Sequence, residues 1–298
     1  AVGFISGFLV AVPLAHLNPN AYFSSAIIML EPFDIIGGLL GQGSPDLMCA
    51  AGFSDSPHFM YSGYDKNGKW YQLYQIGFGG IPGRPMGDGA DGHSLWPSFT
   101  NVPNEFLESY FPLRIELYET IPDSGGPGFN RGGNGVRVGY RFLEKGEISI
   151  HDDRWLTFPW GVNGGKPGQR SRKILLRSSG EEELVPSKCD RVSVEINDML
   201  LFETWGGGGW GNPLEREIER IVLDVKRGLV TQIGAREFGV VIDEDGEVDE
   251  VATEKLREQM SKTIKNQKVF DKGGDLESIK DKCLIETGFS PPIDPKLQ

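Results

Sequence analysis

The chain has 298 residues, is 39% hydrophobic and carries a formal net charge of −12, which suits one large or two smaller globular domains. The negative charge and the absence of a basic cluster argue against nucleic acid or an anionic membrane surface as the main partner. The 41 glycines and 19 prolines are spread along the sequence and predict many turns and short strands.

Residues 1–15 are uncharged and mostly apolar. They are too few to span a membrane and lack the basic flank of a signal peptide, so we expect a buried strand. Because the chain does not begin with Met, this end is interpreted as a processed or truncated boundary.

A first helix is predicted at residues 24–40, where Pro32 interrupts an apolar pattern. Short strands are predicted after it at 47–51, 58–64 and 70–78. A turn at residues 65–68 makes the last two a hairpin.

A glycine-rich stretch follows at residues 79–93 and carries Asp88, Asp91 and His93. Two carboxylates and an imidazole on a flexible backbone leave metal ligation open there.

The chain is organised around residues 123–135, which hold six glycines in thirteen positions. This stretch lies between alternating, strand-like patterns at 110–119 and 136–142. Glycine is costly to order, so such a run indicates a backbone that needs positive φ or close approach to another group. We interpret it as a shaped functional loop, with a ligand-free surface turn as the alternative.

Beyond this loop, strands are predicted at 147–150 and 155–158, on either side of a charged run, His151 to Arg154. Neighbours on a strand point to opposite faces, which favours a surface charge network over an acid/base cluster. Residues 161–168 resemble a phosphate loop but fail its pattern, because Pro167 stands where Ser or Thr would meet magnesium.

Further strands are predicted at 173–177, 191–196 and 199–203, ahead of a second glycine run. Gly206, Gly208 and Gly211 have the spacing of a dinucleotide motif, yet one strand and one helix are not a βαβ unit. The helix that follows, at 214–227, has Asn212 as its N-cap and Gly228 as its stop.

The C-terminal part predicts a short helix at 231–238, a strand at 240–242 and a helix at 250–266. From Gln267 onward we expect an extended or disordered tail. The fold class is therefore α+β, with a body of short, mostly antiparallel strands joined by glycine-rich loops. We divide it at residue 243, with 244–298 as a charged extension.

Four motifs together resemble the hydantoinase B/oxoprolinase family: residues 101–105, 123–126, 131–135 and 205–213. The resemblance covers roughly residues 17–242. It implies a B-type subunit or domain that works with an ATP-using A-type partner on cyclic amides such as hydantoins and 5-oxoproline. Other members of the family are subunits of acetone or acetophenone carboxylases.

The chain departs from the family in its metal ligands. In the family these His and Asp residues lie in an N-terminal half, upstream of everything seen here. None of His16, His58, His93 and His151 has the family's His-x-x-Asp arrangement. We therefore assign no metal ligand, and the resemblance implies ATP and a divalent metal only for the full complex. That complex also includes the N-terminal half of the B component.

No catalytic residue can be assigned. Candidates for lining a small-molecule site are taken from the matching motifs: Asn104, Asp123, Ser124, Gly125, Gly126, Arg131, Gly132, Gly133, Gly206, Gly207, Gly208 and Gly209. Glycine N–H groups form nests that bind a phosphate or a developing oxyanion, and we expect Asp123 and Arg131 to fix their loop by an ion pair or hydrogen bonds.

Three functions stay open at this stage. The chain could be part of an ATP-dependent cyclic-amide hydrolase, part of a ketone carboxylase, or a non-catalytic interaction fragment. A fragment is expected to be inactive in isolation.

Overall fold

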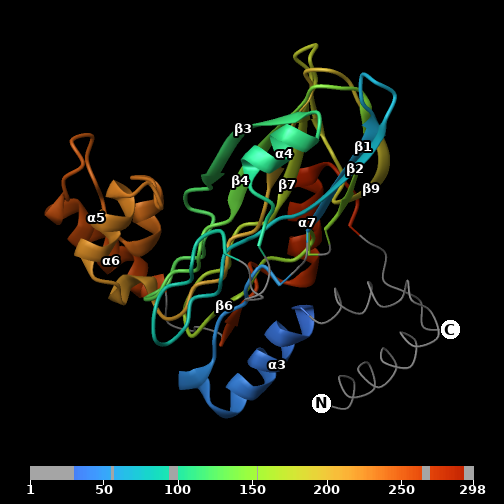
Figure 1. Ribbon diagram of the computed structural model, residues 1–298. Helices are drawn as coiled ribbons and strands as arrows, with labels where there is room; N and C mark the ends of the chain where they lie inside the picture. The colour runs from blue at the N-terminus through green and yellow to red at the C-terminus, as the bar shows by residue number, and fades with distance from the viewer. Residues whose placement is uncertain (1–29, 55–56, 94–99, 153, 264–268, 292–298) are drawn as a thin grey trace.

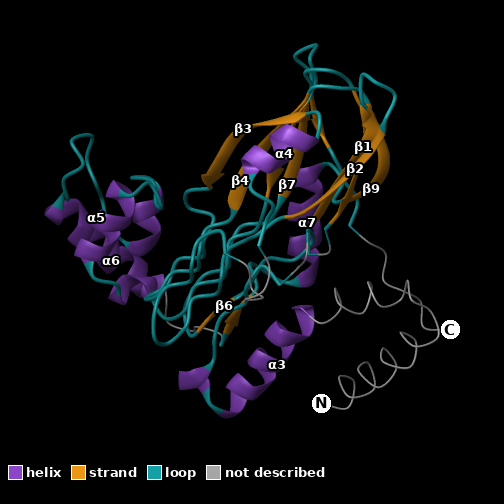
Figure 2. Ribbon diagram, viewed as in Figure 1, coloured by secondary structure: helices purple, strands orange, loops and turns teal. Residues whose placement is uncertain are grey.

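The computed structural model describes residues 30–54, 57–93, 100–152, 154–263 and 269–291. Two sheets lie at one end, long loops run beneath them, and α3 lies at the opposite end of these loops (Figure 1). A separate group of helices flanks the loops (Figure 2). The predictions for residues 1–15 and for the first turns of the 24–40 helix lie outside the described residues.

The two main sheets are antiparallel throughout, so the predicted α+β class is confirmed. The four-stranded sheet has the order β2 (Trp70–Ile76), β1 (His58–Tyr64), β5 (Gly146–His151) and β9 (Lys188–Val194). The five-stranded sheet has the order β3 (Leu113–Thr120), β4 (Val136–Phe142), β10 (Met199–Glu203), β7 (Arg172–Leu176) and β8 (Glu182–Leu184).

The core lies between these two sheets. Side chains of both sheets form one buried cluster, in which the rings of Phe59 and Tyr140 lie 4.6 Å apart and those of Tyr61 and Phe142 lie 4.8 Å apart. Alternate residues of β2 are buried, as the period of a strand with one wet face requires. The alternation along such a strand therefore indicates which of its faces packs inward.

The helices lie outside this sandwich. They are α3 (Leu30–Gly43), α4 (Asn104–Tyr110), α5 (Ile218–Lys226), α6 (Glu250–Thr263) and α7 (Leu276–Thr287), with 3₁₀ turns at Pro45–Leu47, Pro213–Glu215 and Gly234–Phe238. In the described part of the chain, none of them is long and apolar enough to cross a bilayer.

The predicted helix at 214–227 is wrong at its start. Asn212 accepts a hydrogen bond from the N–H of Leu214, but it caps only the 3₁₀ turn. Arg216 and Glu217 are extended, and α5 begins at Ile218. The reason is that the Arg216 side chain is drawn into a buried cluster of charges, where it is 1% exposed.

The prediction of an extended tail from Gln267 is also wrong. β11 (Phe270–Asp271) pairs with β6 (Gly161–Val162), and α7 follows it. Asp275 caps α7 by accepting from the N–H of Ser278 at 2.8 Å, and Gly288 ends it in the left-handed conformation. Only two residues of α7 are buried, Ile279 and Cys283, which explains why its sequence pattern is weak.

The strands predicted at 47–51 and 155–158 are not present. Instead, Ala50 and Ala51 donate backbone hydrogen bonds to Gly83 and Trp160, in the layer of loops beneath the sheets. This layer holds most of the sequence candidates.

Candidate functional site

Five extended loop segments run side by side beneath the sheets and form what we call the glycine bundle (Figure 2). They are residues 50–53, 79–92, 124–135, 159–169 and 205–211. The glycine-rich stretches at residues 79–93, 123–135 and 206–211 are far apart along the chain but thus pack against one another.

Residues 205–211 are the centre of the bundle. Their N–H groups donate to different segments, and over residues 206–210 the segment recurs every three residues: Gly206 to Gln169 (3.3 Å), Gly209 to Lys166 (2.8 Å), Gly207 to Gly133 (2.8 Å), Trp210 to Asn130 (2.8 Å) and Gly208 to Ala51 (2.7 Å). Gly211 has positive φ and ends this pattern by donating to Val162 at 3.0 Å. A period of three without internal hydrogen bonds is that of a polyproline II helix. The central segment therefore holds its neighbours on three sides.

The glycines of the bundle are required because backbones touch there. A Cβ atom on Gly133 would lie 1.9 Å from the carbonyl oxygen of Ala90, and one on Gly132 would lie 1.9 Å from that of Gly207. Neither glycine has positive φ. Of the two explanations open at the sequence level, close approach is therefore the correct one.

The N–H groups of the candidate glycines already have acceptors. Gly126 donates to Gly207 at 2.7 Å, Gly132 to Gly126 at 2.9 Å, and Gly125 to the side chain of Asn134 at 2.8 Å. These groups join segments and do not form the open anion nest that we expected. A role for these residues in lining a substrate site stays a prediction.

Asp123 and Ser124 fix the start of the central loop. Asp123 has φ of 62°, and its carboxylate accepts from the N–H of Thr231 at 2.8 Å and from its hydroxyl at 2.6 Å. Ser124 donates to the carbonyl of Ile121 at 2.7 Å and accepts from the N–H of Gly135 at 2.9 Å. Asp123 therefore ties the loop to the helical group, and no hydrogen bond or ion pair joins it to Arg131 in the part of the chain described.

Arg131 instead belongs to what we call the Arg–Asp cluster. It comprises three arginines and three aspartates: Arg131, Arg216, Arg220, Asp88, Asp91 and Asp224. Arg131 makes two hydrogen bonds to Asp91, at 2.7 and 3.0 Å, and lies 3.6 Å from Asp224. Arg216 makes two to Asp88, at 2.7 and 2.9 Å, and one to Asp224 at 2.7 Å.

The cluster joins the bundle to the helical group. Asp224 lies on α5, whose apolar face packs into a small separate core with Phe238 and Val240. Burial of Asp88 opposes its ionisation, but the hydrogen bonds and charges of Arg216 and Arg220 outweigh burial, so the pKa of Asp88 is lowered. The charges balance, three against three, as buried ionic groups require.

The metal interpretation of residues 79–93 finds no support in this geometry. Asp88 and Asp91 are bound by arginines. Among the described residues, no group of three or more His, Cys, Asp or Glu side chains could hold a metal ion. These residues therefore do not fit the divalent metal that the resemblance implies for the full complex.

A second buried ion pair lies where the sheets meet the bundle. Lys173 pairs with Asp152, which also accepts from the hydroxyl of Ser171 at 2.7 Å. The Lys173 ammonium lies 4.8 Å from the ring centre of Trp205. Asp152 is fully buried and Arg154 nearly so, whereas His151 makes an exposed contact with Asp190 at 3.1 Å.

The predicted surface charge network is thus right for His151 and wrong for Asp152 and Arg154. The burial of Lys173 could have been predicted from the sequence, because Lys173 and Leu175 are two residues apart and therefore lie on the same face of β7. Nothing comparable in the sequence indicates that Asp224 or Arg216 is buried.

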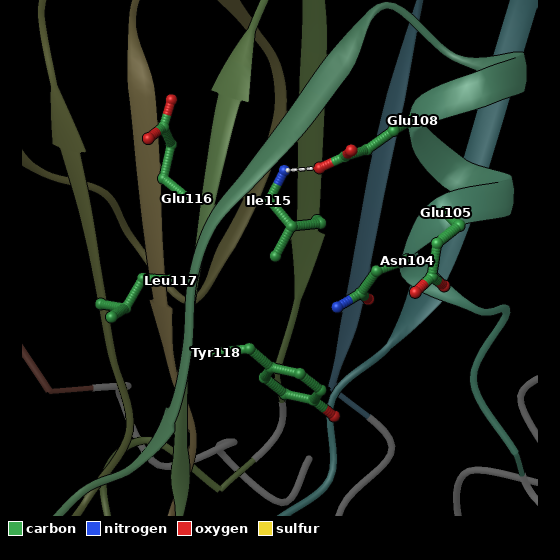
Figure 3. Close-up of a pocket in the computed structure, with 7 residues that line it drawn as sticks. All are labelled: Asn104, Glu105, Glu108, Ile115, Glu116, Leu117 and Tyr118. Carbon is green, nitrogen blue, oxygen red and sulfur yellow. Dashed lines mark hydrogen bonds between the residues drawn. The ribbon is translucent and has the colours of Figure 1, made fainter.

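Asn104 is placed far from the glycine bundle, at a hollow of about 290 Å³ between α4 and β3 (Figure 3). Its carboxamide points into the space between the helix and the strand. The sequence candidates therefore fall into two places, the bundle and this hollow.

A family profile for hydantoinase B/oxoprolinase matches residues 15–213. The chain belongs to this family. A protein of Pseudomonas sp. (strain NS671), provisionally named as the B-type subunit of a D-/L-hydantoinase, is 33% identical over 212 residues, covering 70% of this chain and 36% of the relative. The chain thus spans about a third or less of the length of the curated relatives it matches.

Two solved structures share the fold of this hydantoinase B/oxoprolinase chain. The ATP-dependent caprolactamase from Pseudomonas jessenii aligns with a TM-score of 0.63 and 26% identity, over 74% of this chain and 40% of that one. The nucleotide-free acetone carboxylase aligns with a TM-score of 0.62 and 19% identity, over 83% of this chain and 38% of that one, and supports the fold alone.

Gly133→Ala tests the packing of the bundle. We expect the free energy of unfolding to fall by about 3 kcal/mol or more, because a backbone oxygen occupies the space that the methyl group needs. Gly87→Ala is the matched control, since a Cβ there has no heavy atom within 4 Å and φ is not positive. Urea denaturation followed by tryptophan fluorescence measures both, and equal values for the two variants would contradict the account.

Asp88→Asn tests the Arg–Asp cluster. The pKa of Asp88 in the folded protein lies below its value in the unfolded chain, which is about 3.9. The ionised carboxylate therefore stabilises the folded protein fully above that pH, and this stabilisation is lost as the pH falls through the pKa of the folded state. We expect the variant to lose about 3 kcal/mol of stability at pH 7, and the loss to shrink below about pH 4.

Denaturation of the wild type and the variant at several pH values measures this difference. Asp245→Asn, in an exposed turn, is the control and should change little. A loss for Asp88→Asn that stays constant from pH 7 to pH 3 would argue against the cluster.

Proposed function

We propose that this chain is the C-terminal scaffold of the B-type component of an ATP-dependent hydrolase of cyclic amides. The likeness to the ATP-dependent caprolactamase structure, at 26% identity, is the observation that carries the proposal. The relative provisionally named as a B-type hydantoinase subunit supports the same class.

The reaction needs ATP because a cyclic amide resists water at neutral pH. Phosphoryl transfer to the amide oxygen removes the resonance that protects the carbonyl, and water can then attack the carbon. We assign ATP use to an A-type partner. Residues 161–168 lack the pattern of a phosphate loop, and Lys166 pairs with Asp271 at 3.2 Å.

In this proposal, the described part of the chain gives the complex a rigid support. Backbone N–H groups and carbonyls of the glycine bundle pair across five segments, and the Arg–Asp cluster fixes the helical group to it. A rigid body of this kind holds neighbouring surfaces in fixed positions, which a preorganised site requires. The three cysteines, Cys49, Cys189 and Cys283, are all free, which suits a reducing compartment, and we therefore place the complex in the cytoplasm.

ATP turnover of the chain assembled with its A-type partner and the N-terminal half of the B component tests this proposal. We expect phosphate release to increase when hydantoin or 5-oxoproline is added without bicarbonate, and the isolated chain to release none. The carboxylase alternative predicts that ketone-dependent release requires bicarbonate. An assembled complex in which neither substrate changes ATP turnover would leave a non-catalytic interaction role and would contradict the proposal.

A further inference from the structure

β2 is an edge strand of the four-stranded sheet, and its backbone groups point alternately toward β1 and away from it. The N–H of Asp65 donates to Lys69 at 2.9 Å, and the N–H of Gly77 donates to Pro57 at 2.8 Å. Because hydrogen-bonded pairs alternate along antiparallel strands, the odd-numbered residues of β2 face β1. The N–H and C=O groups of its even-numbered residues therefore point to the outer edge of the sheet.

Three of these even-numbered residues are Trp70, Gln72 and Ile76. Within the described residues, their backbone N–H and C=O groups make no hydrogen bond. A row of unpaired strand N–H and C=O groups is a template for pairing with another extended backbone. We call this row the β2 edge.

β2 also lacks the features that protect an edge strand from pairing. β3 and β9 each carry charged side chains and a bulge, and β8 has only three residues, two of them glutamates. β2 has seven residues, none of them charged or proline, and its register with β1 is unbroken. Among the edge strands of the two main sheets as described, β2 is therefore the one that could accept a further strand.

Aromatic side chains flank the β2 edge on the outer face of the sheet. Trp70 is 55% exposed, its cross-strand neighbour Tyr64 is 67% exposed, and Tyr74 is 39% exposed. A strand added beside β2 would place every second side chain next to the rings of β2.

The helix α4 lies between β3 and β2 (Figure 1). Glu108 accepts from the N–H of Ile115 on β3, and Leu107 is buried in the core. Successive helix residues are about 100° apart, so Phe106 and Tyr110 lie on the side of α4 that faces away from β3. Their rings are exposed and stack with centres 4.1 Å apart. This side of the helix is therefore turned toward the β2 edge.

These surroundings define the chemistry of the occupant. A strand added to β2 has aromatic rings beside both of its faces and no charged side chain of β2 beside it, which favours a segment that is uncharged and apolar on both faces. A second copy of this chain is a poor occupant, because each copy has a net charge of −12 and would bring its own α4 to the same edge.

We propose that the β2 edge binds an extended, uncharged and apolar segment of a partner polypeptide as an additional strand of the four-stranded sheet. The backbone of the segment pairs with Trp70, Gln72 and Ile76. Its side chains lie alternately beside Trp70 on the outer face and beside Phe106 and Tyr110 on the inner side. The inference concerns only this surface and does not depend on the proposed reaction.

The test is native-state hydrogen exchange of the 298-residue chain with and without acetyl-Lys-Val-Ile-Val-Phe-Val-Lys-amide, N-methylated at its Ile and Phe. The methyl groups leave the peptide one edge that can pair and prevent its aggregation. We expect the amides of Trp70, Gln72 and Ile76 to exchange at least about tenfold more slowly with saturating peptide. The amides of Tyr71 and Leu73 face β1 already and should change little.

The control peptide has the same side chains and charges but is N-methylated at every residue between its lysines. It cannot pair with a strand, so we expect it to leave the exchange of all these amides unchanged. Equal protection by the two peptides, protection confined to other parts of the chain, or no protection would overturn the proposal.

Gln72→Pro locates the contact. Proline removes an N–H that points to the edge and leaves the hydrogen bonds to β1 in place, so the sheet is retained and the peptide should bind at least about tenfold more weakly. Glu182→Pro is the matched control, because the bond from the Arg177 N–H to Glu181 shows that the N–H of Glu182 also points away from its sheet. Unchanged affinity in Gln72→Pro would overturn the proposal.

Exchange in the absence of peptide tests for an edge that is already covered. Slow exchange of Trp70, Gln72 and Ile76 that depends on protein concentration would assign the edge to a second copy. Slow exchange that does not depend on concentration would assign it to a segment of the same chain, such as residues 1–15. Either result would overturn the proposal.

Discussion

Direct contact between backbones is the constraint on which this structure depends. Five loop segments approach so closely that no Cβ fits between them at Gly132, Gly133 or Gly206, and their N–H groups and carbonyls pair across the gaps. Glycine loses more conformational freedom on ordering than other residues, so this arrangement needs many hydrogen bonds to offset the cost. The central segment, residues 205–211, supplies them on three sides.

Charged side chains stabilise the ends of the bundle, and a small apolar cluster that includes Ala50, Trp160, Val162 and Trp210 packs on its segments. The Arg–Asp cluster holds the helical group at one end, and Lys173 with Asp152 lies beneath Trp205 where the bundle meets the sheets. In both sets the buried charges are paired with opposite charges, because an unpaired buried charge would be far more costly than a paired one. The scaffold thus has an apolar core in the sheets and a hydrogen-bonded core in the bundle.

The sequence predicted those parts of the fold that depend on local periodicity. Strands β1, β2, β4 and β10 follow alternation along a few residues, which one chain segment displays by itself. The sequence placed residues 123–135 and 206–211 at one site, but it could not predict that they pair backbone to backbone, because a glycine has no side chain to indicate its neighbour. The break before α5 was missed for a related reason: Arg216 leaves the helix to reach Asp88, 128 positions away in sequence. α7 was missed because it buries only two residues.

Membership of the hydantoinase B/oxoprolinase family gives this scaffold its context, and the account rests on the glycine bundle being a rigid body. Native-state hydrogen exchange of the amides of Gly126, Gly133 and Gly207 measures this most directly. The account predicts exchange as slow as that of β4 and β10, in the centre of the five-stranded sheet. Exchange as fast as that of Asp245, in an exposed turn, would contradict it.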